Sequence, residues 1–154
     1  MAARLPSLAG RPLNLVVAVD FIHFHRTKPS FGCDLKKPEG HAAPLKLIAQ
    51  VDVFVSNVRP EGLARAGLDH ASLSKTNPRL IHCQILAFGR NGRYYNRPAY
   101  DPVIQSLSGV AGTIARATGE PRFVPMVVSD HTSGLIAAQC VGFALYRLAK
   151  TGNG

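Results

Sequence analysis

Acidic residues are scarce in this sequence, with 9 Asp and Glu against 18 Lys and Arg, so the formal net charge is +9. A strongly basic balance raises the hypothesis of a nucleic-acid partner. The basic residues are scattered, however, with Lys36-Lys37 as the longest run, and they form no stripe with aromatic residues of the kind that stacks bases. We therefore expect no nucleic-acid partner. A phosphate-bearing small ligand would use the same charge, and a solvated basic surface is the plain alternative.

Cysteine is also rare, and Cys33, Cys83 and Cys140 lie far apart without a C-x-x-C spacing. This pattern argues against a zinc site or a disulfide framework and fits a reducing compartment. The choice between cytoplasm and mitochondrion stays open. The six histidines show no metal-ligand pattern, because His23 and His25 alternate without a third ligand nearby. We predict no metal site.

Uncharged runs are short. The longest candidate, residues 133–146, is too short to span a membrane and is interrupted by Gln139, so we predict a buried helix and no membrane partner. The segment before Asp20 lacks acids and contains Arg4 and Arg11, a faint likeness to a transit peptide that we attribute to chance.

The composition that remains is that of one foldable domain, since 46% of the 154 residues are hydrophobic and 18% are charged. Apolar runs predict strands at 14–21, 53–55, 79–86 and 124–128. Helical patterns are predicted from residue 38 and at 60–66, 69–75, 101–110 and 131–150. This alternation predicts an α/β fold with a Rossmann-like parallel sheet flanked by helices.

Asp130 has the most unusual setting of the nine carboxylates. It follows the predicted strand 124–128 and opens the predicted helix 131–150. Ligands collect at the carboxyl ends of parallel strands, so a carboxylate there is a candidate nucleophile. The alternative is an N-cap, because Asp130-His131-Thr132-Ser133 is typical of a helix start, and the two roles are compatible. No G-x-S-x-G, P-loop or G-x-G-x-x-G motif is present.

Four segments, in the same order, resemble the class III CoA-transferase superfamily, which includes formyl-CoA transferase, carnitine CoA-transferase and α-methylacyl-CoA racemase. Residues 34–40 read DLKKPEG, similar to the family's D-L-K-x-P-E-G, and residues 52–68 read DVFVSNVRPEGLARAGL. Residues 77–109 contain NPRLIHCQILAFG and RPAYD, and residues 128–154 contain DHTSG followed by the apolar helix. Four ordered segments are far more specific than any single motif.

The resemblance implies transfer of coenzyme A from an acyl thioester to a carboxylic acid. Asp130 falls on the family's catalytic aspartate, which attacks the acyl-CoA carbonyl to give a mixed anhydride and then an aspartyl-CoA thioester. Asn57 and Arg65 fall on positions that resemble the CoA site, and Tyr100 falls on an aromatic residue near the acyl group. The plain alternatives are a solvated helix face for Arg65 and loop packing for Tyr100. No cofactor is implied, because the CoA thioester is the substrate.

Tyr100 also bears on the choice between branches of the family. The racemase branch places a histidine base directly before the aspartate of the R-P-x-Y-D segment, where this sequence has Tyr100. A tyrosine, with a reference pKa near 10, is a poor base at neutral pH. The sequence therefore favours a transferase over a racemase.

The resemblance has limits that shape the expected domain organisation. Residues 1–25 do not match the family, and a C-terminal small domain is lacking, so we expect residues 26–154 to form a partial class III domain. The family's Glu-Asn and Pro-Gly are Ser56-Asn57 and Pro60-Glu61 here. The implied partners are acyl-CoA, a carboxylic acid and a second copy in an interlocked homodimer. The alternative is a non-catalytic remnant or binding module that pairs with a longer paralogue.

Overall fold

The computed structural model describes residues 2–5, 13–16 and 24–154, and the chain divides into two compact units, Met1–Gly32 and Cys33–Gly154. In the first unit, β1 (Ala2–Leu5) pairs with β2 (Leu13–Val16) in antiparallel orientation. The strand predicted at 14–21 overlaps β2 over three residues, and its remainder lies outside the described residues.

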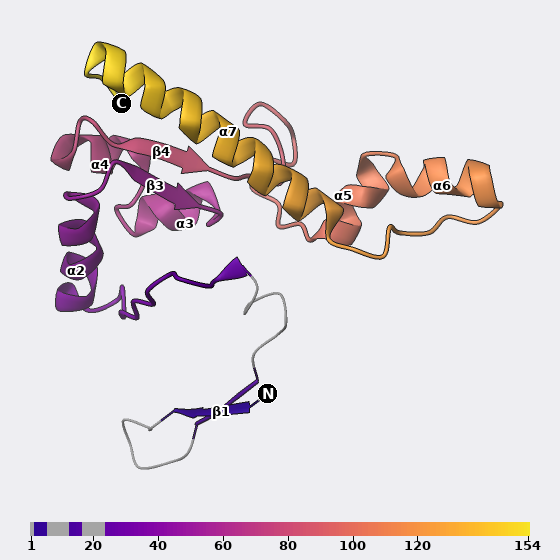
Figure 1. Cartoon of the computed structure of the whole chain (residues 1–154), viewed down its shortest axis with the longest axis horizontal. Helices are drawn as coiled ribbons and strands as arrows, with labels where there is room; N and C mark the ends of the chain where they lie inside the picture. Colours follow the sequence, from indigo (N-terminus) through magenta and orange to yellow (C-terminus); the bar gives the residue numbers. More distant parts are fainter. Residues whose placement is uncertain (1, 6–12, 17–23) are drawn as a thin grey trace. The chain divides into compact units, whose positions relative to one another are not determined.

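The second unit contains a parallel pair of strands, with Val53 opposite Ile81 and Ser56 opposite Gln84. This pairing confirms the predicted α/β class with a parallel sheet flanked by helices. Figure 1 shows its elements in chain order: α2 (Pro38–Ile48), β3 (Val53–Ser56), α3 (Pro60–Arg65), α4 (His70–Thr76), β4 (Ile81–Gln84), α5 (Asp101–Leu107), α6 (Val110–Thr118) and α7 (Val128–Thr151).

Three of these helices carry proline in the first turn, at Pro38, Pro60 and Pro102. Proline is tolerated there because its fixed φ suits the helix and its missing N–H has no helical acceptor. The predicted helix starts at 38, 60 and 101 are thereby confirmed.

The two faces of the strand pair have different neighbours. Phe54 packs against the buried cluster of Ile48, Leu63, Leu68, Leu73 and Leu80, which comes from α2, α3, α4 and the segments beside α3 and β4. Phe54 pairs with His82 of β4, so these two side chains share a face. Side chains alternate between faces along a strand, so Cys83, the residue after His82, faces the other way. Burial raises the pKa of the Cys83 thiol, and Cys140 of α7 raises it further. Helix α7 therefore runs along the face opposite the leucine cluster (Figure 1).

The segment before α7 differs from the prediction. The strand predicted at 124–128 is wrong, because residues 121–127 are irregular and α7 already begins at Val128. Pro121 and Pro125 interrupt the segment, and proline has no N–H to give to a strand pair. Asp130 consequently lies inside the first turn of α7, so the alternative of Asp130 as the N-cap is also wrong.

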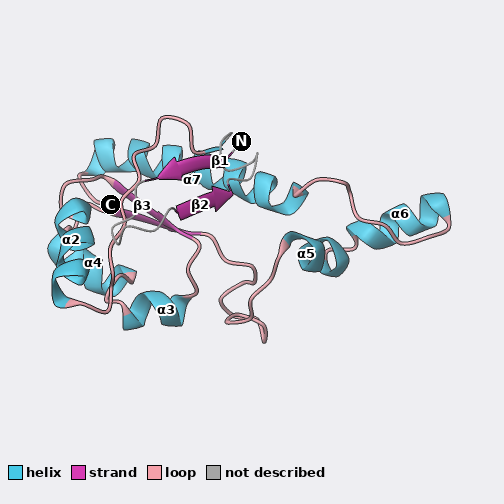
Figure 2. Ribbon diagram, turned by 90° about the horizontal axis from the view of Figure 1, so that it is seen from below, coloured by secondary structure: helices cyan, strands magenta, loops and turns pink. Residues whose placement is uncertain are grey.

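The region between α5 and α7 contains a helix that the sequence did not predict. Gly109, with φ of 86°, ends the continuous helix expected at 101–110, and α6 follows. Gly119, also with φ of 86°, ends α6. A residue with a side chain rarely adopts this left-handed conformation, so glycine marks both ends. Figure 2 shows α5 beyond the end of the strand pair, next to the N-terminal part of α7, and α6 farther out.

Helix α7 is much more exposed than predicted. Leu135 is 68% exposed and Phe143 is 75% exposed, whereas Leu148 near the C-terminal end is buried. The prediction of a buried helix is therefore wrong for most of its length. Within the described part of the chain, no helix has the length and apolar character needed to cross a bilayer.

Candidate functional site

The N-terminus of α7 is held by a carboxylate from another helix. Asp101, the first residue of α5, is only 3% exposed. Its Oδ2 accepts a hydrogen bond of 2.6 Å from the Ser129 N–H and a longer one of 3.4 Å from the Asp130 N–H. The first N–H groups of a helix have no helical acceptor, and the residue before α7, Val127, has no side-chain oxygen to supply one. Asp101 replaces the missing local cap.

Gln105 completes this junction one helical turn along α5. Its side-chain amide donates to Asp101 Oδ1 and to the Met126 carbonyl oxygen, the latter at 3.2 Å. Its Oε1 accepts a hydrogen bond of 2.8 Å from the Val124 N–H. The side chain of Gln105 thus supplies the hydrogen bonds that a neighbouring strand would have given residues 124–126. We call the set Asp101, Gln105 and residues 124–130 the α5–α7 junction.

The junction also fixes the charge of Asp101. The hydrogen bond from Gln105 and those from the Ser129 and Asp130 N–H groups hold the pKa of the Asp101 carboxyl below its ordinary value of 3.8, although burial opposes them. Asp101 is therefore an anion at neutral pH, a state that suits its place beside a positive helix N-terminus.

Asp130 projects its carboxylate from this junction into solvent. Its side chain is exposed and forms no hydrogen bond or ion pair with any described residue. Because Asp101 accepts the N–H groups of Ser129 and Asp130, the Asp130 carboxylate is not used to cap its own helix. The arrangement gives a fixed backbone, a free carboxylate and a helix dipole that favours negative charge.

The other predicted site residues fall into two groups. Tyr100 directly precedes Asp101 and is 82% exposed, so it and Asp130 both belong to the surroundings of the α5–α7 junction. Asn57 follows the carboxyl end of β3, and Arg65 is the last residue of α3; both are exposed. No hydrogen bond or ion pair between described residues links Asn57 or Arg65 to the junction.

Asp101 and Gln105 are the residues that reasoning from sequence did not select. The apolar residues Val103 and Leu107 of their helix are 43% and 62% exposed, whereas Asp101 and Gln105 are 3% and 1% exposed. Two hydrogen-bonding residues four positions apart lie on one helix face. This spacing of Asp101 and Gln105 was the signal in the sequence that could have indicated a shared polar contact. Within the described residues, no group of three or more His, Cys, Asp or Glu is arranged to hold a metal.

Comparison with known proteins identifies the family. The sequence profile of CoA-transferase family III matches residues 16–154, so the chain belongs to that family. It is 35% identical over 130 residues to a succinate–glutarate CoA-transferase of Agrobacterium fabrum, covering 84% of this chain and 32% of the relative. It is 34% identical over 139 residues to an acetyl-CoA:oxalate CoA-transferase of Acetobacter aceti, covering 87% of this chain and 35% of that relative.

Solved structures agree with this assignment. A CaiB/BaiF family protein from Brucella suis superposes with a TM-score of 0.75 at 34% identity, covering 79% of this chain and 32% of that one. The chain therefore spans about a third of the length of the relatives it matches. The resemblance stated from the sequence motifs is confirmed at the level of the family and of the fold.

Replacing Gln105 by Leu should loosen the junction. The Val124 N–H and Met126 carbonyl would lose their partner, which costs about 1–3 kcal/mol when such groups are buried. We expect a lower free energy of unfolding in urea and faster hydrogen exchange of the Val124 amide. Gln139→Leu, on the exposed surface of α7, is the matched control and should change stability by less than about 0.5 kcal/mol. Unchanged exchange at Val124 would contradict this role for Gln105.

Stability should also depend on the charge of Asp101. Its pKa is lower in the folded than in the unfolded chain, so its contribution is present above about pH 4 and is lost as the pH falls through the folded-state value. Asp101→Asn should therefore be less stable than the parent at neutral pH, and the difference should shrink on acidification. Urea unfolding between about pH 7 and pH 3 measures this, with Glu120→Gln, an exposed carboxylate, as the control. A difference that stays constant with pH would exclude the charge as its source.

Proposed function

We propose that the protein containing this chain transfers coenzyme A from an acyl-CoA thioester to a carboxylic acid, with Asp130 as the covalent nucleophile. The observation that carries the proposal is the exposed Asp130 carboxylate in the first turn of α7, on a backbone that Asp101 and Gln105 hold in place. A positioned nucleophile reduces the entropy cost of attack. Residues 26–154 are proposed as a partial class III domain.

The proposed chemistry balances without a redox step or a net proton transfer. An Asp130 oxygen attacks the acyl carbonyl carbon, the C–S bond breaks, and CoA leaves as the thiolate. The thiolate attacks the Asp130 carbonyl of the mixed anhydride, which releases the donor carboxylate and leaves an aspartyl-CoA thioester. The acceptor carboxylate then repeats the sequence in reverse and regenerates Asp130. Each hard substitution is divided into easier steps.

Three further residues are proposed to bind CoA. Arg65 presents an exposed, permanently charged guanidinium at the end of α3, which suits a phosphate. Asn57 follows the carboxyl end of β3, the end of a parallel strand where ligands collect. Tyr100 is exposed beside Asp101 and suits the acyl or pantetheine part of the substrate. A racemase is disfavoured, because Tyr100 stands where that branch has its histidine base.

Asp130→Asn should abolish formation of the acyl intermediate while leaving the fold intact, because the side chain is exposed and bonds to no described residue. The test is mass spectrometry after incubation with several acyl-CoAs, with hydroxylamine to trap an activated ester. We expect an adduct at Asp130 in the parent chain and a loss of at least about 10³-fold in the variant, as for other deleted nucleophiles. Glu120→Gln, another exposed carboxylate, should retain the adduct. An equal yield of the trapped adduct in Asp130→Asn would show that Asp130 is not the nucleophile.

The exposed apolar side of α7 supports a second proposal, that the chain pairs with another copy. Leu135, Ile136, Phe143 and Tyr146 are each more than half exposed, and apolar patches of this kind mark interaction surfaces. Pairing with a longer paralogue is the competing proposal from the same observation.

Light scattering should distinguish these two forms of pairing. A homodimer has twice the 16.5 kDa mass of the chain, and Phe143→Asp should shift it toward monomer because the charge would be buried. Phe123→Asp, an exposed phenylalanine outside α7, should leave the mass unchanged. A monomer at every concentration would rule out the homodimer.

A further inference from the structure

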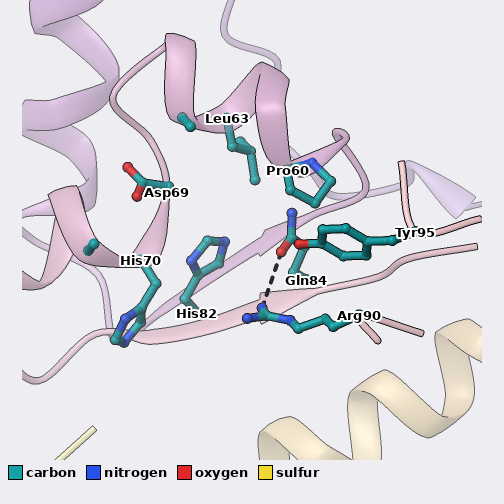
Figure 3. Close-up of a pocket in the computed structure, with 10 residues that line it drawn as sticks. Pro60, Leu63, Asp69, His70, His82, Gln84, Arg90 and Tyr95 are labelled. Carbon is teal, nitrogen blue, oxygen red and sulfur yellow. Dashed lines mark hydrogen bonds between the residues drawn. The ribbon is translucent and has the colours of Figure 1, made fainter. Parts of the chain in front are cut away.

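A cavity of about 360 Å³ opens between α3, α4, β4 and the loop after β4 (Figure 3). One wall is apolar and consists of Pro60, Leu63 and Ala64 of α3. The facing wall is polar and includes His82 and Gln84 of β4 together with Arg90. Its volume is at the low end of the range for ligand pockets, so its occupant is small. Asp130, Asn57, Arg65 and Tyr100 do not line it.

His82 lines this cavity and has an unused hydrogen-bonding atom. Its Nε2 is buried and has no hydrogen-bond partner among the described residues. The ring packs against Phe54, with centroids 5.1 Å apart, and lies nearly parallel to His70 at 6.2 Å. Burial lowers the pKa of His82, electrostatic interaction with His70 and Arg90 lowers it further, and Asp69 opposes these effects. A buried ring nitrogen without a partner is costly, and a polar ligand would satisfy it.

Arg90 supplies the positive charge. Its Nη2 donates only a long hydrogen bond of 3.4 Å to Gln84 Oε1. The Nε2 of the same glutamine donates to the Val58 carbonyl oxygen at 3.2 Å. No carboxylate in the described part of the chain forms an ion pair with Arg90. A guanidinium without a carboxylate offers a planar pair of donors that matches a carboxylate ligand.

Asp69 limits the charge that the ligand can carry. Hydrogen bonds from Ser72 lower the pKa of Asp69, so the cavity wall contains a fixed negative charge as well as Arg90. A dianion such as phosphate would be repelled by Asp69 more strongly than a monoanion. The apolar wall of α3 suits a short hydrocarbon body, which phosphate lacks.

We propose that this cavity binds a small monocarboxylic acid, with its carboxylate on Arg90 and His82 and its hydrocarbon body against Leu63 and Ala64. The site is separate from Asp130, and the proposal does not depend on the transfer reaction. In this site the chain would bind a free carboxylic acid without transferring coenzyme A to it.

The test is titration of the purified chain with sodium butyrate, followed by the NMR resonances of the His82 ring and by calorimetry. Butyramide, which has the same shape without the charge, and inorganic phosphate are the comparison ligands. We expect butyrate to shift the His82 resonances and to bind more tightly than either. Arg90→Gln should weaken butyrate binding by at least about tenfold, since a hydrogen bond to a charged group is lost. His82→Phe, which keeps a ring against Phe54, should also weaken it.

Arg93→Gln is the matched control, because Arg93 lies in the same loop but stacks over Tyr94, with 4.8 Å to the ring centroid, and does not line the cavity. It should bind butyrate like the parent. Asp130→Asn should also bind normally, so a failure of the transfer reaction leaves this result unaffected. The proposal is overturned if butyrate does not bind, if butyramide or phosphate binds as tightly, or if Arg90→Gln and Arg93→Gln behave alike.

Discussion

The hydrogen bonds of Asp101 and Gln105 to the segment before α7 are the interaction on which the candidate active site depends. They join two helices that are separated by α6 and by an irregular segment with two prolines. Asp101 satisfies N–H groups that the helix cannot satisfy itself, and Gln105 satisfies the backbone that precedes them. Without this junction, the first turn of α7 would have no partner in α5, and Asp130 would have no fixed position.

Helix α7 carries the effect of the junction across the unit. Its N-terminal end is held by Asp101, and at its C-terminal end Arg79 Nη1 donates a hydrogen bond of 3.2 Å to the carbonyl oxygen of Gly152. Between these ends the helix packs along β4 on one side and leaves apolar residues exposed on the other. A helix of 24 residues held at both ends is a rigid support for a carboxylate in its first turn.

The two candidate sites use opposite electrostatic arrangements. At the α5–α7 junction, the charge of a buried carboxylate is stabilised by hydrogen bonds from Gln105 and from helix N–H groups, and a second carboxylate is exposed without a partner among the described residues. In the cavity beside α3 and α4, a guanidinium has no carboxylate partner and a buried imidazole nitrogen has no hydrogen-bond partner among the described residues. The first arrangement suits attack on an acyl group, and the second suits retention of an anion. Both place their polar atoms by hydrogen bonds or ring packing from neighbouring elements.

Local sequence determined the features that depend on short-range chemistry. Helical patterns predicted where α2, α3 and α5 begin, and the apolar runs at β3 and β4 predicted a parallel strand pair, because these signals act within a few residues. Ordered motifs also determined the family and singled out Asp130.

Tertiary structure decided what depends on contacts between distant residues. Residues 124–128 have the composition of a strand, yet Gln105, about 20 residues earlier, takes their hydrogen bonds in place of a neighbouring strand. The cap of α7 comes from Asp101, 28 residues before Ser129, so no local pattern announces it. The exposure of α7 was likewise decided by its neighbours, because an apolar helix is buried only where another element covers it.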